Sequence, residues 1–301
     1  MLLCPVCSEP LTLIGATCSC PRHHTFDVAR EGYINLLVGG ARGMAGDTKE
    51  MLRARRAFLE HGFYAPLSEH VDTIALNYLT SHSSPYVGRG TAHHDEAMAA
   101  EQPVALDAGC GEGYYLGRLR EALEVRFGAG AFSCVGVDIA KEAARLAAKR
   151  YPAIRFAVAD VKRRIPLATG SVTLSLNIFA PRNSAELARV VAPSGTLLVV
   201  IPGPHHLAEL RERYGLLGIE PEKERHIAAQ LAREFAQTES SPLEYMMDLS
   251  GEDVRQLLRM TPNARHRERQ GWEEAAHEAA RVTASFLVLG FQRAWSPHEE
   301  A

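Results

Sequence analysis

Cysteine and histidine side chains gather at the start of the chain. Four of the six cysteines lie before residue 21, and two histidines follow the fourth after a gap of two residues. One pair forms a Cys-x-x-Cys turn, and twelve residues separate it from Cys20, which is a normal loop length for a zinc ribbon. Thiolate and imidazole ligands suit zinc better than harder metals. The spacing leaves the ligand set open among Cys4, Cys7, Cys18, Cys20, His23 and His24.

Four protein ligands would close the coordination shell of such a metal. A catalytic zinc keeps one position open for water or substrate, so this pattern predicts one structural Zn²⁺ per chain. A unit of about 40 residues buries too little apolar surface to fold alone, so the metal would supply much of its folding free energy.

A glycine-rich turn begins with an acid and follows a short apolar run at 104–106. It reads Asp-x-Gly-x-Gly-x-Gly, and its acid and glycines are Asp107, Gly109, Gly111 and Gly113. Glycine permits a tight turn between a strand and a helix and lets a ligand approach the backbone. An acid at this place would repel a pyrophosphate, but it can orient the cationic amino-acid end of S-adenosylmethionine, directly or through water. The turn therefore favours S-adenosylmethionine over a dinucleotide.

Two further acids end the next two expected strands. Asp138 closes the strand at 132–138, and Asp160 follows the strand at 154–158. In a doubly wound sheet, both lie at the edge where ligands bind. Asp138 can accept the two hydroxyls of a ribose, and Asp160 is well placed for an adenine amino group. Each acid alone could equally be a helix cap, but their order predicts a methyltransferase rather than a dehydrogenase.

The segment 177–183, Asn-Ile-Phe-Ala-Pro-Arg-Asn, follows the fourth expected strand, where the methyl acceptor should lie. It lacks the Pro-Pro-aromatic pattern of methyltransferases that act on exocyclic amines, and it contains no cysteine for a covalent route. We expect Asn177 to hydrogen-bond the edge of the methyl acceptor and Arg182 to hold a phosphate.

The expected helix at 48–60 carries Arg53, Arg55 and Arg56 on or near one side. A solvated face is one interpretation, and contact with RNA phosphates is the other, because a few well-placed arginines suffice for it. Asp47 is the expected N-cap of this helix.

From residue 103 onward, apolar strands alternate with helical segments, which indicates a parallel sheet covered on both faces. We predict a Rossmann-like class I S-adenosylmethionine-dependent methyltransferase with a seven-stranded, mostly parallel sheet and a small N-terminal zinc-binding domain. The expected domains are a zinc-binding module at 1–38, a helical connector and loop at 39–100, and the methyltransferase domain at 101–301.

The composition of the chain limits which partners and which cellular location we expect. The 301 residues are 46% hydrophobic and carry a net charge of −3, so RNA binding would need local basic patches. No apolar run is long enough for a membrane span, and the first residues do not form a signal peptide, so we expect a cytoplasmic protein that does not contact membranes.

The motifs together resemble the RlmA/TlrB-type 23S rRNA guanine-N1 methyltransferases. The resemblance covers nearly the whole chain and rests on the Cys/His opening, on Ala29-Arg-Glu-Gly-Tyr-Ile-Asn-Leu-Leu37, on the glycine turn, and on Pro202-Gly-Pro-His-His-Leu207. The segment at 177–183 is more similar to the TlrB-like, Gram-positive branch. The stretch at 81–99 is longer than in the family.

The resemblance implies functions for particular residues. It implies that Cys4, Cys7, Cys20 and His24 bind zinc, and that Gly111 and Glu112 touch S-adenosylmethionine while Tyr64 and His206 reach toward it from either side. It also implies a guanine in a hairpin loop of domain II of 23S rRNA as the substrate, and a homodimer. With that substrate, we expect the zinc module and the arginine helix to bind the hairpin and Asn177 to bond the edge of the guanine. Whether such an activity confers antibiotic resistance stays open.

Two alternative functions compete with this one. The chain could methylate a small molecule, with the zinc module as a lid or a dimer contact. It could also be a non-catalytic RNA-binding protein that keeps a cofactor site, although the intact glycines and acids argue against that. Binding to RNA that depends on salt would favour the rRNA methyltransferase.

Overall fold

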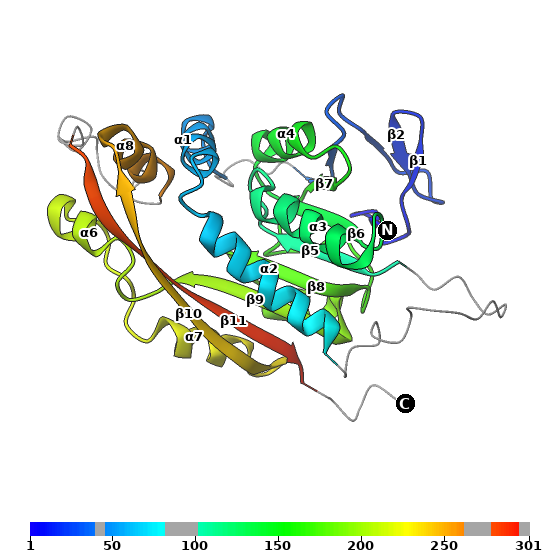
Figure 1. Ribbon diagram of the computed structural model, residues 1–301. Helices are drawn as coiled ribbons and strands as arrows, with labels where there is room; N and C mark the ends of the chain where they lie inside the picture. Colours follow the sequence, from blue (N-terminus) through cyan, green and yellow to red (C-terminus); the bar gives the residue numbers. More distant parts are fainter. Residues whose placement is uncertain (40–45, 82–101, 262–277, 295–301) are drawn as a thin grey trace.

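A computed structural model describes residues 1–39, 46–81, 102–261 and 278–294, and its centre is one twisted sheet (Figure 1). Five parallel strands form the middle of the sheet: β5 (Val104–Ala108), β6 (Ser133–Asp138), β7 (Arg155–Val158), β8 (Val172–Ile178) and β9 (Val191–Pro202). The long strand β11 (Ala280–Arg293) pairs antiparallel with β9, and β10 (Phe235–Leu249) pairs antiparallel with β11. The predicted mostly parallel sheet is confirmed.

The sheet has eight strands among the described residues, one more than predicted. The extra strand is β4 (Ile34–Asn35), which comes from the N-terminal unit and pairs parallel with β7. The full order is β10-β11-β9-β8-β5-β6-β7-β4. The count of seven holds for the strands after residue 103. It fails for the whole sheet because the pairing of a two-residue strand leaves no periodic signal in the sequence.

Two layers cover the sheet. One face is packed by α1 (Lys49–Glu60), α2 (Ala65–Thr80), α3 (Tyr114–Phe127), α4 (Lys141–Arg150), α6 (Ala208–Tyr214) and α8 (Gly251–Met260). The other is packed by α5 (Ser184–Val190), α7 (Lys223–Leu231) and the N-terminal unit. Strands β5 and β8 are buried along their whole length, as expected for parallel strands covered on both sides.

The N-terminal unit is a small antiparallel sheet of β1 (Thr12–Ile14), β2 (Thr17–Ser19) and β3 (Thr25–Asp27). It does not stand apart from the large sheet. Leu2 bridges to Leu167, and the buried side chains of Cys4, Cys18 and Leu36 belong to the same apolar cluster as that leucine. The unit therefore shares its core with the rest of the protein.

The chain reverses its direction of travel across the sheet between β5 and β8. From β5 it moves to β6 and β7 on one side, and then returns to β8 and β9 on the other. Ligands bind at such a switch point, beyond the carboxyl ends of the strands. The turns after β5, β6, β7 and β8 meet at this edge, which is where the sequence predicts the cofactor and the target base.

The structure tests the predicted N-cap of α1 but describes only the first residue of the stretch at 81–99. The N-cap of α1 is Thr48, whose hydroxyl accepts a hydrogen bond from the Met51 amide, so the expectation of Asp47 was wrong by one position. The unusually long stretch at 81–99 lies outside the described residues, apart from Ser81. No helix in the described ranges is long and apolar enough to cross a membrane.

Candidate active site and zinc centre

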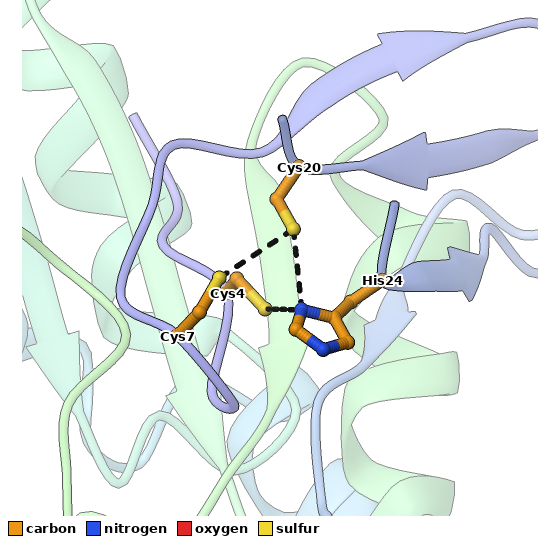
Figure 2. Close-up of side chains that lie close together, drawn as sticks. All are labelled: Cys4, Cys7, Cys20 and His24. Carbon is orange, nitrogen blue, oxygen red and sulfur yellow. Dashed lines mark hydrogen bonds between the residues drawn. The ribbon is translucent and has the colours of Figure 1, made fainter. Parts of the chain in front are cut away.

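Four side chains of the N-terminal unit converge on one point (Figure 2). Cys4 and Cys7 come from the turn before β1, Cys20 follows β2, and His24 precedes β3. Their ligand atoms all lie within 4.8 Å of one another. The exposed His23 and the buried Cys18 lie outside this cluster, so the set that the family resemblance implies is the one that the fold assembles.

The distances within the cluster suit tetrahedral zinc. The Sγ atoms of Cys7 and Cys20 are 3.5 Å apart, and the Nδ1 atom of His24 lies 3.4 Å from Cys20 Sγ and 3.6 Å from Cys4 Sγ. A tetrahedron with zinc–sulfur bonds of about 2.3 Å has edges of about 3.8 Å. Burial alone would raise the pKa of Cys20, but the backbone amide of His24 and the neighbouring ligands lower it to about 6, which favours the thiolate that binds metal.

The glycine turn after β5 is packed too tightly for other residues at two positions. Gly109 has a φ of +94°, and a side chain there would collide with the Cβ atom of Ala180 from the turn after β8. Gly113 has a φ of +79°, and a Cβ atom would press on the Phe156 ring. Glycine alone meets both demands without strain. The turn is thus held against the segment after β8 on one side and against the sheet on the other.

Three buried acids around this turn each keep one carboxylate oxygen without a partner among the described residues. These atoms are Oδ1 of Asp107, Oε1 of Glu112 and Oδ2 of Asp160. The three side chains are at most 7% exposed. A buried carboxylate oxygen without a hydrogen bond is costly, so each marks a place where a ligand donor would be stabilising. The ammonium group and the adenine amine of S-adenosylmethionine are donors of the kind that these oxygens lack.

Asp138 is held in place by the backbone on both sides. Its Oδ2 accepts a hydrogen bond from the Gly111 amide at 2.8 Å, and its Oδ1 accepts one from the Ala140 amide at 2.8 Å. Burial raises the pKa of Asp138, while these two amides oppose the shift. Burial and the nearby Asp138 raise the pKa of Asp107 to about 8. The charged form of Asp107 is therefore disfavoured until a cation lies beside it.

Tyr64 and His206 form a pair close to Phe179, which follows β8. The Tyr64 hydroxyl lies 3.4 Å from Nε2 of His206, and the Ser285 amide donates to Nδ1 of the same ring at 3.3 Å. Burial, with Arg211 nearby, lowers the pKa of His206 to about 4, so the ring is neutral. Because Nδ1 accepts, the ring proton sits on Nε2 and is donated to Tyr64. The hydroxyl hydrogen of Tyr64 is then available to a third group.

The three arginines of α1 have different surroundings. Arg56 Nε donates to Oε2 of Glu112 at 3.1 Å, and the Nη1 atom of Arg55 lies 2.5 Å from the Asp47 carboxylate. Arg55 also reaches the region above Gly111. Arg53 is exposed. Two of the three side chains therefore help to build the wall of the site, and Arg53 remains the one that presents its charge outward.

Asn177 is fully buried at the end of β8. Its Nδ2 atom donates to the carbonyls of Ala108 and Pro181 at 3.0 and 3.1 Å, and its Oδ1 accepts from Nε of Arg182 at 3.1 Å. Direct bonding of Asn177 to a guanine edge does not fit this arrangement, because both amide hydrogens are already used. Asn177 instead ties the loop at 179–182 to the end of β5, and Arg182, half-buried, completes the tie.

Sequence reasoning missed three residues of this region. Asp47 pairs with Arg55 at the glycine turn, Phe286 packs edge-on against Tyr64 with ring centroids 5.1 Å apart, and Phe179 lies exposed directly after β8. Phe286 sits on the last strand, so only the three-dimensional pairing with β9 brings it here. An aromatic residue directly after a strand end was the available signal for Phe179.

Family models match both parts of the chain. Residues 2–38 match the model of the RlmA N-terminal zinc ribbon, and residues 105–195 match that of a methyltransferase domain. The two matches cover the zinc cluster and the glycine turn with its acids.

Three relatives match along most of their length. The 23S rRNA (guanine(748)-N(1))-methyltransferase of Streptomyces fradiae is 38% identical over 267 residues, which are 89% of this chain and 86% of that protein. Proteins of Micromonospora griseorubida and Bacillus subtilis are described as candidate 23S rRNA (guanine-N(1)-)-methyltransferases. The first is 38% identical, covering 94% of this chain and 91% of its own, and the second is 32% identical, covering 88% and 86%.

Proposed function

The chain belongs to the family of 23S rRNA (guanine-N1)-methyltransferases, and from that membership we propose how its own residues carry out the reaction. The enzyme transfers a methyl group from S-adenosylmethionine to N1 of a guanine in 23S rRNA. The structural observation that carries the proposal is the set of three buried carboxylate oxygens without partners around the glycine turn.

In this proposal, each acid at the edge of the sheet binds a different part of the cofactor. Asp138 accepts the ribose hydroxyls, and Oδ2 of Asp160 accepts the adenine amino group. Asp107 faces the ammonium group, directly or through water. Gly109, Gly111 and Gly113 let the cofactor approach the backbone, and Glu112, Tyr64 and His206 line the same place. S-adenosylmethionine, when bound, supplies a methyl group already activated on a sulfonium.

The protein's contribution to the transfer is alignment. Two reactants held at the correct distance and angle react far faster than free ones, so rigid positioning is the main requirement. The loop at 179–182 is rigid because Asn177 binds it from beneath. The proton on N1 of guanine must leave during the reaction, to water or to a base. Arg182 stabilises this loop and orients the base through it.

For the RNA, we propose a guanine in a hairpin loop of domain II, the equivalent of the position in the Streptomyces fradiae enzyme's name, and membership of the Gram-positive, TlrB-like branch. The zinc unit and the exposed Arg53 grip the hairpin, mainly through its backbone and shape. Three functional regions follow: the zinc module at 1–38, the connector at 39–100 and the methyltransferase domain at 101–301. A homodimer in the cytoplasm is the expected form.

Primer extension on rRNA tests the proposal most directly. N1 methylation blocks Watson–Crick pairing, so reverse transcriptase should stop at one nucleotide in 23S rRNA from cells that contain the protein, and not in rRNA from cells that lack it. A matched strain that carries Asp138→Ala should show no stop. Identical stops in all three samples, or none in any, would contradict the proposal.

A further inference from the structure

Phe179 is the one aromatic side chain that the described part of the chain leaves exposed. Its exposed fraction is 45%, whereas Tyr64 and Phe286 beside it are 4% and 1% exposed. It follows β8 directly, at the edge of the sheet where the glycine turn also lies. Burying a phenylalanine stabilises a protein, so the exposed ring of Phe179 is explained by a function other than stability.

The backbone at Phe179 is strained and held from both sides. Its φ is +51°, a left-handed conformation that residues other than glycine adopt at a cost in free energy. The Phe179 amide donates to the Val200 carbonyl at 3.2 Å, and the following Ala180 is pressed against Gly109. Asn177 holds the Pro181 carbonyl. The surrounding contacts hold Phe179 in this strained conformation. The orientation of its ring therefore has a function.

Phe179 rests on a wall of buried aromatic rings. Its centroid lies 5.7 Å from that of Phe286 and 6.5 Å from that of Tyr64, with interplanar angles of 48° and 50°. His206 packs behind them, 4.7 Å from Phe286. The wall stops the ring of Phe179 from turning inward. The part of its surface not in contact with the wall stays open to a flat, apolar partner.

The partner must also lie close to the cofactor. Tyr64 both contacts the Phe179 ring and meets His206 at the place where we propose that S-adenosylmethionine binds. The tight contact between Ala180 and Gly109 brings the loop after β8 onto the cofactor's glycine turn. A group stacked on Phe179 would therefore be within the region to which the methyl group is delivered.

We propose that Phe179 is the platform on which the target guanine stacks after it leaves the RNA helix. The inference rests on the proposed function and names a residue that positions its substrate. Enzymes that modify a base must take it out of its stack, and an aromatic ring replaces the lost stacking. Stacking uses the face of the base and leaves its Watson–Crick edge, with N1, free. Since every base has such a face, Phe179 strengthens RNA binding and alignment but does not select guanine.

Substitutions at Phe179 distinguish the effect of its aromatic ring from the effect of its apolar side-chain volume. Phe179→Leu keeps an apolar side chain without a ring, whereas Phe179→Tyr and Phe179→Trp keep a ring. With a 23S rRNA hairpin transcript, we expect Phe179→Leu to lower kcat/KM by about tenfold to a hundredfold, mostly through KM for RNA, and the ring-bearing variants to stay within about threefold of wild type. Val125→Ala, which trims an exposed apolar side chain on α3, is the matched control and should behave like wild type.

Two further measurements distinguish stacking from a structural role. The dissociation constant for S-adenosylmethionine should be unchanged in Phe179→Leu. A transcript with 2-aminopurine in place of the target guanine should fluoresce more brightly on Phe179→Leu than on wild type, because stacking on the ring quenches it. Unchanged RNA kinetics in Phe179→Leu, or a parallel loss of cofactor affinity, would overturn the inference while wild-type transfer upholds the proposed function. No transfer by the wild-type chain would overturn both.

Discussion

A single buried acid should govern how S-adenosylmethionine binding depends on pH. Burial and the neighbouring Asp138 raise the pKa of Asp107 from 3.8 to about 8. The folded state therefore holds a proton that the unfolded state loses near 3.8, so the free energy of unfolding falls as the pH rises from about 4 to about 8. A cationic ligand reverses this shift, because it favours the charged carboxylate.

The affinity for S-adenosylmethionine should thus rise with pH up to about 8, by at most about tenfold for each pH unit. Asp107→Asn should bind more weakly and lose this slope, and its unfolding temperature at pH 8 should equal or exceed that of wild type. Calorimetric titrations between about pH 6 and about pH 8 measure the slope. The same slope in Asp107→Asn would contradict the assignment.

Asn177 should matter for alignment more than for binding. Asn177→Ala leaves the carbonyls of Ala108 and Pro181 without their donor, so it should lower the free energy of unfolding by about 1–3 kcal/mol. Methyl transfer should fall about tenfold or more, because a misplaced loop misaligns the reacting groups. Urea unfolding and transfer of tritiated methyl groups measure the two effects.

Asn183→Ala is the control for that variant. Asn183 caps α5 through the Glu186 amide and donates to the Lys162 carbonyl, but it has no bond to the loop at 179–182. Its loss should cost about 1 kcal/mol and leave the rate of transfer unchanged. If Asn177→Ala transfers methyl groups as fast as Asn183→Ala, the loop needs no support from Asn177.

At the residue scale, the sequence predicts which residues bear the chemistry better than it predicts which atoms those residues contact. Residue types and order were enough to single out Asp107, Asp138 and Asp160, because parallel strands end at one edge of a sheet. They could not reveal that both amide hydrogens of Asn177 are used inside the protein. That fact depends on the carbonyl of Ala108, which lies 69 positions earlier.

At the scale of elements, the N-terminal unit should depend on zinc. Leu36 donates its amide to the Val158 carbonyl, and Leu2 bridges to Leu167, so disorder in this unit would expose the outer edge of β7. His24→Ala should lose the bound zinc, lower the unfolding temperature and speed amide exchange in β4 and β7. Metal analysis and hydrogen exchange measure these changes.

His23→Ala provides the matched control. His23 is exposed and lies outside the cluster, although it adjoins His24 in the chain. It should retain one zinc per chain and wild-type exchange. Loss of zinc from both variants, or from neither, would contradict the ligand set.

Helices and parallel strands follow their sequence patterns closely. The segment 141–150, rich in alanine, lysine and arginine, predicts a helix, and α4 begins and ends at these two residues. Strand β10 differs from its pattern. The sequence predicts a strand near 243–249, but β10 starts at Phe235, because the segment before residue 243 is rich in exposed polar residues and contains Pro242. Such a segment becomes a strand through its pairing with β11. Proline is acceptable there because β10 is an edge strand.

At the scale of the whole molecule, RNA binding has to come from local charge. The net charge is −3, so attraction to RNA phosphates depends on particular side chains such as Arg53. Arg53→Ala should weaken binding to the rRNA hairpin and make the slope of log K against log salt less steep by about 1. Arg126→Ala removes an exposed arginine at the far end of α3 and should leave the slope unchanged. Equal slopes in both variants would show that Arg53 touches no phosphate.

The pairing of β4 with β7 also determines when the N-terminal unit can complete its folding during synthesis. Ile34 pairs with Ala157, a residue made 123 positions later. At about 5–20 residues per second, the N-terminal unit waits roughly 6–25 seconds for the strand that will cover it. During that interval only its own short strands and its metal can hold it together. A site closed by four ligands within this unit lets it capture its ion as it leaves the ribosome and keep its shape until β7 is synthesised.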